Sequence, residues 1–518
     1  MSKKVIIGGR GSDLALWQAN FFQDSLTAIG VDSEIKIITT KGDRIQDLSF
    51  DKIEGKGFFT KEIESALLEG SIDVAIHSHK DLETQMPPGL IIAGVSQRAN
   101  PSDVILIRPN AIDHTMPFGF KKSAVVGTSS ARRKSQILAL RGDVEIKDIR
   151  GNVPTRVNKL RNGDFDAILL AAAGLERLQL DVSDLKKWEL DPRIFVPAPA
   201  QGVLAYQCRS DDAGLIETIK RLDDRSTRNA IQIERALLSG FGGGCHIPIG
   251  VYAKPQEDHF NVRVSFGQDW TMLPKRIRFS ASNVEDALSI FDKISKMSAP
   301  ESVLITKHQD EASHILRACR QFDVKVHQTS FIEVEPVKFQ LPNDFDWIFF
   351  ASSNAVDAFF QNVSEVQIKD KRTAVFGEST ARALHRYLDK IDFIPNAGQP
   401  NEVAIEISKV VGDQRVLFPS SNQSLGSIAK LLSPDQVIEV ETYRTNIIAR
   451  KLENLPEAAI FYSPSNVTGF VDGGNDLGKL KKVIAIGNSA AAEIKKHGAQ
   501  PLIADIPHQA ELFALLCS

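Results

Sequence analysis

The sequence predicts a multidomain α/β protein. Its 518 residues are too many for one hydrophobic core and correspond to about three to five domains at roughly 100–200 residues each. Short β-branched runs alternate with amphipathic helical patterns in the first part of the chain, which indicates α/β layers. Two similar segments, residues 347–384 and 459–494, indicate a duplicated α/β lobe in the second part.

The strands expected in the first part are short apolar runs. They are Lys4–Ile7, Ser33–Thr39, Asp73–His77, Leu90–Ala93, Val104–Ile107, Ala124–Val126 and Ala167–Ala171. Helices are expected at Thr60–Glu69 and Ser130–Leu140, each ended by a nearby glycine. A long helix over Asp223–Ser239 belongs to a small α+β unit that spans about residues 215–298. Ligand-bearing loops should lie at the carboxyl ends of the strands.

The duplicated segments share one order of elements. Each reads as a strand, a Ser/Asn turn, a helix and then a strand–glycine–helix unit. Ser352 lies 25 residues before Gly377, and Ser463 lies 24 residues before Gly487. Two similar α/β lobes explain this agreement better than chance.

Composition narrows the class of protein. The formal net charge is −3, with 42% apolar and 25% charged residues, which is typical of a globular chain and not of a disordered or nucleic-acid-packaging one. None of the four cysteines lies in a CxxC pair, so we expect a reducing compartment and no structural zinc. No apolar run is long enough for a signal peptide or a membrane span, and we therefore expect a cytoplasmic protein.

Residues 121–161 form the most basic stretch of the chain. They contain eleven Lys and Arg residues against three acidic residues, a local balance of +8. Arg132 and Arg133 fall in the first turn of an expected helix, where the helix dipole disfavours each cation by about 0.3–1 kcal/mol, so a negative partner is expected. The stretch has no aromatic residue for base stacking, which favours a polycarboxylate or polyphosphate small molecule over nucleic acid. A solvated charged face and a phosphate-tracking role remain open.

Three further motifs can carry chemistry. His77-Ser-His-Lys-Asp81 follows an apolar strand; its histidines are more consistent with a structural role than with a metal site, and Asp81 should stay ionised and able to stabilise a cation. The turn Gly8-Gly-Arg-Gly-Ser12 suits an anion, although an ordinary strand–helix turn is equally compatible. Cys245 follows three glycines, which fits either covalent use or a small core residue.

These motifs, in this order, resemble hydroxymethylbilane synthase, also called porphobilinogen deaminase. The matching motifs are Gly9–Ser12, Gly55–Glu62, His77–Asp81, Gly127–Arg133, Arg150–Arg156, Ala172–Leu178, Pro199–Gly202 and Gly243–Gly250. The resemblance covers about residues 4–298. Residues 301–518 resemble uroporphyrinogen-III synthase through the doubled Ser/Asn turn, Glu441–Thr445 and Ala485–Ser489.

The resemblance implies two consecutive activities of tetrapyrrole biosynthesis, a step toward heme. The first half would join four porphobilinogens into hydroxymethylbilane with release of ammonia. The second half would invert the last ring and close the macrocycle as uroporphyrinogen III. Each pyrrole carries an acetate and a propionate, which supplies the acidic partner expected for the basic stretch. An active first enzyme with an inactive or regulatory second half is the alternative.

The resemblance also implies the roles of residues in the first half. Cys245 would hold a dipyrromethane cofactor through a thioether, and Asp81 would stabilise the cation left after ammonia departs. Cofactor binding falls to Lys80, Thr128, Ser129, Arg132, Arg133 and Arg156, and substrate binding to Arg10, Ser12, Lys56, Arg150, Arg177 and Gln201. His79 and His246 depart from the residues usual in the family, methionine and glutamine.

In the second half, neutral turn residues are implied to bind the substrate. They are Ser352, Asn354, Ser463, Ser465 and Ser489, and Tyr443 is the candidate for assisting loss of the terminal hydroxyl, although a buried strand tyrosine is equally compatible with the sequence. Residues 419–424 depart from the turn common in that family.

The fold implied by the resemblance has five parts. They are two hinged α/β lobes like those of periplasmic binding proteins (residues 1–98 with 199–214, and 99–198), a small α+β domain (215–298) that carries the cofactor cysteine, and two α/β lobes joined by a pair of strands (301–335 with 446–518, and 336–445). We expect a monomer that acts on small molecules, without nucleic acid, membrane or metal.

Overall fold

The computed structural model describes residues 4–40, 60–242, 247–395, 400–424 and 426–518. The described residues form four five-stranded sheets and one three-stranded sheet, flanked by helices, so the chain is a multidomain α/β protein as predicted. Contacts divide it into two compact units: residues 1–112, 120–298 and 513–518 in the first, and residues 113–119 and 299–512 in the second. Each unit is described by itself.

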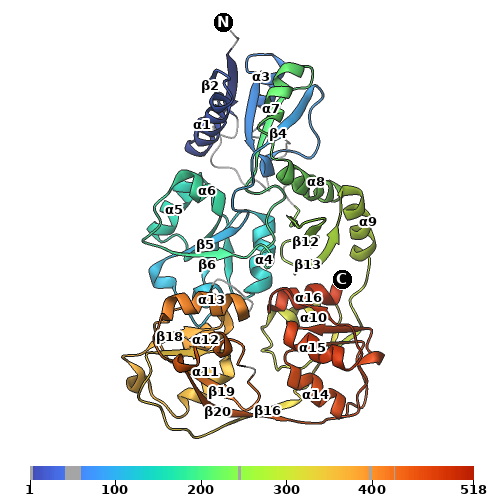
Figure 1. Ribbon diagram of the computed structural model, residues 1–518. Helices are drawn as coiled ribbons and strands as arrows, with labels where there is room; N and C mark the ends of the chain where they lie inside the picture. The colour runs from blue at the N-terminus through green and yellow to red at the C-terminus, as the bar shows by residue number, and fades with distance from the viewer. Residues whose placement is uncertain (1–3, 41–59, 243–246, 396–399, 425) are drawn as a thin grey trace. The chain divides into compact units, whose positions relative to one another are not determined.

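The first sheet of the first unit has the strand order β2-β1-β3-β10-β4. Its strands are β1 (Val5–Gly9), β2 (Ser33–Ile37), β3 (Val74–Ser78), β4 (Leu90–Val95) and β10 (Leu204–Arg209). Strand β1 is parallel to β2 and β3, whereas β10 is antiparallel to β3 and β4. Helices α1 (Asp13–Ala28), α3 (Lys61–Leu68) and α7 (Ala213–Lys220) flank this sheet (Figure 1). The buried residues Phe22 and Leu26 of α1 pack against Ile7 and Val74 of the sheet.

The second sheet of this unit has the order β7-β6-β8-β5-β9. Its strands are β5 (Asp103–Ile107), β6 (Val125–Gly127), β7 (Glu145–Lys147), β8 (Ala167–Ala171) and β9 (Lys186–Leu190), and its helices are α4 (Ala131–Leu140), α5 (Val153–Asn162) and α6 (Ala172–Leu178). All five residues of β5, which lies between β8 and β9, are buried, and the first of them is an aspartate. That buried charge is the basis of the site described below.

A third, antiparallel sheet completes the unit. It consists of β11 (Gly250–Pro255), β12 (Phe260–Phe266) and β13 (Lys275–Ala281), with helices α8 (Arg225–Gly240) and α9 (Val284–Ser295). Helix α8 contacts both β11 and β4, so it links the third sheet to the first.

Two chain segments connect the first two sheets. The chain passes from β4 to β5 and returns from β9 to β10. The segments touch where the Ala99 amide donates a hydrogen bond to the Gly202 carbonyl, 3.0 Å. Gly202 has φ +88°, and a Cβ there would lie 2.6 Å from the Ala99 carbonyl oxygen, so only glycine fits.

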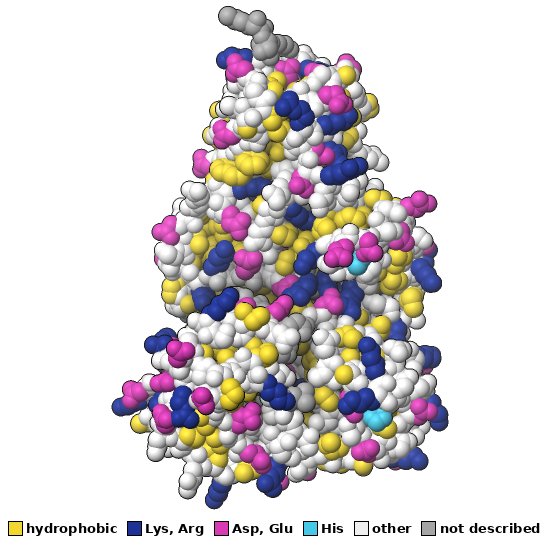
Figure 2. All heavy atoms as spheres, viewed as in Figure 1, with side chains coloured by type: hydrophobic (Ala, Val, Ile, Leu, Met, Phe, Trp, Pro, Cys, Tyr) yellow, Lys and Arg dark blue, Asp and Glu magenta, His cyan; other side chains and the backbone are white. Residues whose placement is uncertain are grey.

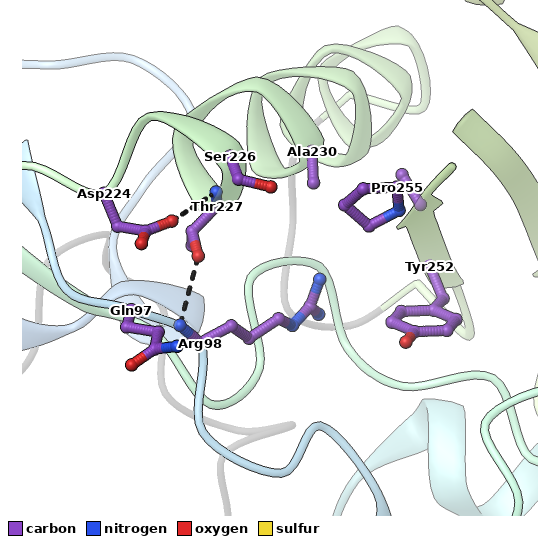
Figure 3. Close-up of a pocket in the computed structure, with 9 residues that line it drawn as sticks. Gln97, Arg98, Asp224, Ser226, Thr227, Ala230, Tyr252 and Pro255 are labelled. Atoms are coloured by element: carbon purple, nitrogen blue, oxygen red, sulfur yellow. Dashed lines mark hydrogen bonds between the residues drawn. The ribbon is translucent and has the colours of Figure 1, made fainter. Parts of the chain in front are cut away.

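Glu234 of α8 joins these segments to the third sheet. Its fully buried carboxylate accepts hydrogen bonds from Arg98 (2.6 and 3.3 Å), the Ala200 amide (2.7 Å) and the Ala253 amide (2.9 Å). A cavity of about 250 Å³ lies beside Arg98, whose side chain extends toward Tyr252 (Figure 3). One buried carboxylate therefore satisfies donors from three segments that are distant in the sequence.

The second unit contains two five-stranded sheets. One has the order β15-β14-β21-β22-β23 and the other β16-β20-β19-β17-β18. The strands are β14 (Ser302–Ile305), β15 (Lys325–Gln328), β16 (Ile332–Pro336), β17 (Trp347–Phe350), β18 (Arg372–Val375), β19 (Val416–Ser421), β20 (Val437–Ile447), β21 (Ala458–Phe461), β22 (Lys482–Ala485) and β23 (Leu502–Ile503). Helices in this half of the chain are α10 (His314–Gln321), α11 (Ser353–Phe360), α12 (Glu378–Leu384), α13 (Pro400–Val411), α14 (Pro464–Asp472), α15 (Asn488–Lys496) and α16 (Gln509–Cys517).

The two similar sequence segments form the same local structure. Ser352 caps α11 after β17, and Ser463 caps α14 after β21; each side chain accepts from the amide three residues on, at 3.2 Å. A parallel strand, a glycine and a second helix follow in both sheets. The repeat in the sequence therefore corresponds to a repeat of β-α-β-α structure.

The elements expected from the sequence form with small shifts at their ends. All seven strands expected in the first part are present, and the three expected helices are α3, α4 and α8. Within the described ranges, no helix combines the length and the apolar character that crossing a membrane requires.

Replacing Glu234 by glutamine should destabilise the first unit. The variant leaves the guanidinium of Arg98, which is 13% exposed, without its counter-ion, and breaking such a pair costs on the order of 3 kcal/mol. Urea unfolding followed by circular dichroism measures the loss. Glu217→Gln is the control, because that carboxylate is 71% exposed and its pair with Lys220 is worth about 0–1 kcal/mol. Equal midpoints for the two variants would contradict the assignment.

Candidate active site

A cluster of cations lies where helical turns follow strands of the first two sheets. Lys80 and Asp81 belong to the 3-10 turn η2 (His79–Asp81), which directly follows β3. Arg132 and Arg133 occupy the first turn of α4, which Ser130 caps after β6. The strand ends thus carry the charged groups, as the sequence predicted.

The partner of the two arginines is Asp103, which the sequence analysis missed. The carboxylate is fully buried and accepts from Arg132 (2.7 and 3.2 Å) and from Arg133 (2.9 Å). Burial raises the pKa of Asp103, but the two guanidinium groups have the larger combined effect. The pKa of Asp103 is therefore lowered, to about 2. Part of the negative charge expected to compensate these arginines therefore comes from the protein itself, through Asp103.

Gln201 connects this ion pair to Lys80. The fully buried Gln201 amide donates to the Pro101 carbonyl (2.7 Å) and to Asp103 (3.4 Å), and its oxygen accepts from Lys80, 3.4 Å. Burial lowers the pKa of Lys80 to about 8; Asp81 opposes this shift, and the charge of Arg133 adds to it.

Arg150 and Arg156 extend the cluster. Burial, followed by repulsion from Arg133 and Arg150, lowers the pKa of Arg156 to about 10, and Asp81 partly counters this. Arg156 also donates to the Gly151 carbonyl, 2.8 Å. Among the described residues, the four cations Lys80, Arg132, Arg133 and Arg156 thus interact with two carboxylates, Asp81 and Asp103. An excess of positive charge fits a ligand that carries several carboxylates.

Asp81 itself is exposed at the edge of this cluster, which leaves its carboxylate accessible to a substrate. The backbone of its turn is held from behind by Arg235 of α8, which donates to the carbonyls of His79 and Leu82, both at 3.2 Å. Arg235 is a second residue that sequence reasoning missed, because it lies far along the chain from the turn that it supports.

The other predicted site residues of the first half are more dispersed. Ser129 exchanges hydrogen bonds with the backbone of Ile149 (2.8 and 3.0 Å), and Thr128 is buried. Arg177 donates to the Gly202 carbonyl (2.9 Å) and stacks on Trp17. Ser12 caps α1, and Arg10 precedes it. Lys56, Cys245 and His246 lie outside the described residues.

The basic stretch does not act as one ligand-binding surface, and this corrects the expectation from the sequence. Arg132, Arg133, Arg150 and Arg156 join the cluster. The cations Lys121, Lys134, Arg141, Lys147 and Arg161 instead pair with Asp166, Asp148, Asp143, Glu145 and Asp184, respectively. Figure 2 shows Lys and Arg side chains interspersed with Asp and Glu on the visible face.

The two histidines near the site are buried. His77 hydrogen-bonds Gln207 (3.0 Å), and burial lowers its pKa to about 4. Burial and then the charge of Arg235 lower the pKa of His79 to about 3. Both are therefore neutral at pH 7, which agrees with a structural role.

In the second unit, the structure brings together two of the predicted residues. The Tyr443 hydroxyl of β20 lies 3.3 Å from the Ser352 hydroxyl at the end of β17. Ser463 and Ser465 begin α14 after a strand of the other sheet, where Ser463 accepts from the Asn466 side chain, 2.9 Å. Asn354 and Ser489 are exposed in the first turns of α11 and α15.

Each half of the chain matches a known protein family. Residues 5–217 match the family model "Porphobilinogen deaminase, dipyromethane cofactor binding domain", residues 229–267 match "Porphobilinogen deaminase, C-terminal domain", and residues 313–514 match "Uroporphyrinogen-III synthase HemD". A porphobilinogen deaminase from Bacillus cereus (strain B4264) is 40% identical over 313 residues, which are 60% of this chain and all of that protein.

Solved structures with lower similarity were also found. A uroporphyrinogen-III synthetase from Helicobacter pylori is 19% identical, covers 41% of this chain and 96% of its own, and has a TM-score of 0.32. A periplasmic binding protein from Salmonella typhimurium is 13% identical, covers 46% of this chain and 99% of its own, and has a TM-score of 0.27.

The fold and the family matches define a multidomain α/β enzyme. The chain belongs to the porphobilinogen deaminase family, and its second half is a uroporphyrinogen-III synthase domain. It is thus a bifunctional enzyme of porphyrin biosynthesis that acts on small pyrrole substrates, and dipyrromethane is the cofactor of its first half. Pyrroles with acetate and propionate side chains fit the excess of cations.

Assembly of the cofactor should depend on the charge of Lys80. Because its pKa is about 8, Lys80 loses its proton, and with it its attraction for carboxylates, as the pH rises above that value. Cofactor-free protein incubated with porphobilinogen should gain the mass of two pyrrole units more slowly above about pH 8. In Lys80→Arg, whose guanidinium stays protonated, the decline should move to higher pH.

Intact-mass spectrometry measures this gain, and Cys245→Ser should show none at any pH. A decline at the same pH in wild type and Lys80→Arg would contradict the role of Lys80.

Proposed function

We propose that the inward-facing cations hold the acidic side chains of cofactor and substrate while pyrrole units are joined. The observation that carries this proposal is the excess of positive charge among Lys80, Arg132, Arg133 and Arg156, which Asp81 and Asp103 balance only in part. An empty cluster of this kind repels itself, and ligand carboxylates relieve the repulsion. The rival function, passive anion binding, gives no reason for an exposed carboxylate beside the cations.

The arginines divide into two groups in this proposal. Arg132 and Arg133 direct most of their donors to Asp103 and to the backbone, so they supply positive potential and fix the geometry. Lys80 and Arg156 have fewer contacts within the protein and bind carboxylates directly. We assign Arg10, Ser12, Lys56, Arg150 and Arg177 to the substrate, together with Gln201, and Thr128 and Ser129 to the cofactor.

Asp81 is the proposed catalytic group of the first half. Its carboxylate stabilises the positive charge that develops on the substrate's pyrrole as ammonia leaves, and it exchanges a proton with the pyrrole nitrogen. Lys80 and Arg156 lie close enough to interact electrostatically with this carboxylate. Arg235 keeps the turn in place from the other side.

We further propose that Cys245 carries the dipyrromethane through a thioether. When bound, this cofactor supplies the primer end at which the pyrrole chain grows. The growing chain needs room, and the paired segments around Ala99 and Gly202 are suited to act as a hinge between two lobes of the kind found in periplasmic binding proteins. The lobe boundaries proposed are those expected from the sequence.

For the second half we propose binding by neutral groups at the strand ends. Ser352, Asn354, Ser463, Ser465 and Ser489 offer hydroxyl, amide and backbone donors to the substrate's carboxylates. Tyr443, held by Ser352, assists departure of the terminal hydroxyl. Folding the linear substrate so that its ends meet supplies most of the rate. A monomeric state and a cytoplasmic location complete the proposal.

The decisive experiment supplies porphobilinogen alone to the full chain and identifies the macrocycle by chromatography. Uroporphyrinogen III should be the main product, because the second half captures hydroxymethylbilane before it closes without inversion. Uroporphyrinogen I as the main product would instead favour a second half that is inactive or regulatory. Absence of porphobilinogen consumption would reject the function of the first half.

Asp81→Ala should lower porphobilinogen turnover by about 10²–10⁴-fold with little effect on folding, since the carboxylate is exposed. Initial rates and thermal unfolding measure the two effects. Asp24→Ala is the control, because Asp24 is an exposed aspartate of α1 that is not in the cluster. Near-normal turnover of Asp81→Ala would refute the assignment.

A further inference from the structure

Lys307 lies two residues after the end of β14, an interior strand of its sheet in the second unit. It follows β14, which is parallel to β21, so it emerges at the same sheet edge as Tyr462. Thr306 fixes these two strand ends: its hydroxyl donates to the Ile460 carbonyl (3.0 Å) and accepts from the Tyr462 amide (3.1 Å). The Lys307 ammonium lies 5.9 Å from the centre of the Tyr462 ring.

A second cation reaches Lys307 from the other sheet of this unit. Arg382 belongs to α12, which follows β18, and it pairs with Glu378 one helical turn earlier, 2.8 Å. The side chain of Lys307 is exposed. Its pKa is nevertheless lowered, mainly because the surrounding protein removes part of its hydration and secondly because of the charge of Arg382. Within the part of the chain that the structure describes, no carboxylate offsets this shift. Lys307 is therefore an exposed cation that interacts with a second cation, Arg382, whose own partner is Glu378.

The hydroxyl of Tyr462 gives an independent observation. It is buried and has no hydrogen-bond partner among the described residues, and burial raises the pKa of this phenol. Buried hydroxyl groups are nearly always paired with protein, water or ligand. An exposed lysine ammonium and an unpaired hydroxyl thus lie at the same tyrosine ring.

We propose that Lys307, Arg382 and Tyr462 form a carboxylate-binding subsite for the linear tetrapyrrole. The two cations bind one acidic side chain from the two sheets of the unit, and Tyr462 adds a hydroxyl donor. A carboxylate held there draws the two sheets toward the same ligand and so orients the chain for ring closure. The subsite rests on the proposed function of the second half and deepens it, because the groups assigned there are otherwise uncharged.

The test uses the full chain with hydroxymethylbilane as substrate. Lys307→Met and Arg382→Met should each raise KM about tenfold or more, which is typical of one lost charge-assisted hydrogen bond, and should lower the ratio of isomer III to isomer I. Lys307→Arg should restore most of the affinity, and Tyr462→Phe should show a smaller increase in KM. The double variant should raise KM by less than the product of the two single increases, because both cations bind the same carboxylate.

Two controls are built into the molecule. The first control is Lys325→Met. Lys325 is an exposed lysine at the start of β15, the neighbour of β14, so it lies at the opposite end of the strands from Lys307. This variant should change neither KM nor the isomer ratio. Porphobilinogen consumption should be unchanged in every variant. The proposal is overturned if Lys307→Met and Arg382→Met both keep the wild-type KM and isomer ratio.

A binding measurement separates this proposal from the function on which it rests. Uroporphyrin III carries the same acidic side chains, and its affinity, measured by calorimetry, should fall about tenfold in Lys307→Met and not in Lys325→Met. Wild type that forms only isomer I would reject the proposed function, while the calorimetric difference would still support the subsite. Equal affinities of Lys307→Met and wild type would reject the subsite even if isomer III is formed.

Discussion

The first half of the protein depends on one buried carboxylate. Asp103 begins a strand that is buried along its whole length, and it holds two adjacent guanidinium groups that could not otherwise be placed inside the protein. Through Gln201 the same carboxylate is connected to Lys80. The position of the cations is therefore set by hydrogen bonds within the protein before any ligand arrives. Such preorganisation lowers the cost of ordering side chains when an acidic ligand binds.

The two halves handle similar ligands with different chemistry. In the mechanism that we propose for the first half, closely spaced cations hold the acidic groups of a chain that grows by repeated condensation. The second half mainly offers hydroxyl and amide groups at strand ends, and it carries out one rearrangement of a finished chain. Strong fixed charge suits retention of a growing intermediate, whereas weaker neutral contacts suit release of a product. The contrast follows from residue type: arginine and lysine at the turns of the first unit, serine and asparagine at those of the second.

Local patterns in the sequence predicted seven strands of the first part and the helices α3, α4 and α8, because periodicity is a property of neighbouring residues; strands β7, β9 and β10 and helix α1 were not predicted. The grouping of Lys80 with Arg132 and Arg133 came from the family resemblance, because these residues follow strands of two different sheets. The partners Asp103, Glu234 and Arg235 were missed, because their contacts join residues 29 to 156 positions apart. The basic stretch was overinterpreted: charge counts do not distinguish Arg141, which pairs with Asp143 two residues away, from Arg156.

Gly202 has a consequence for how this enzyme can vary. A side chain on Gly202 would collide with the Ala99 carbonyl oxygen. The adjacent residue, Gln201, hydrogen-bonds to Asp103. A methyl group at this position would act as a wedge that parts the two connecting segments and displaces the amide next to it. Stability and turnover of this enzyme would then fall together.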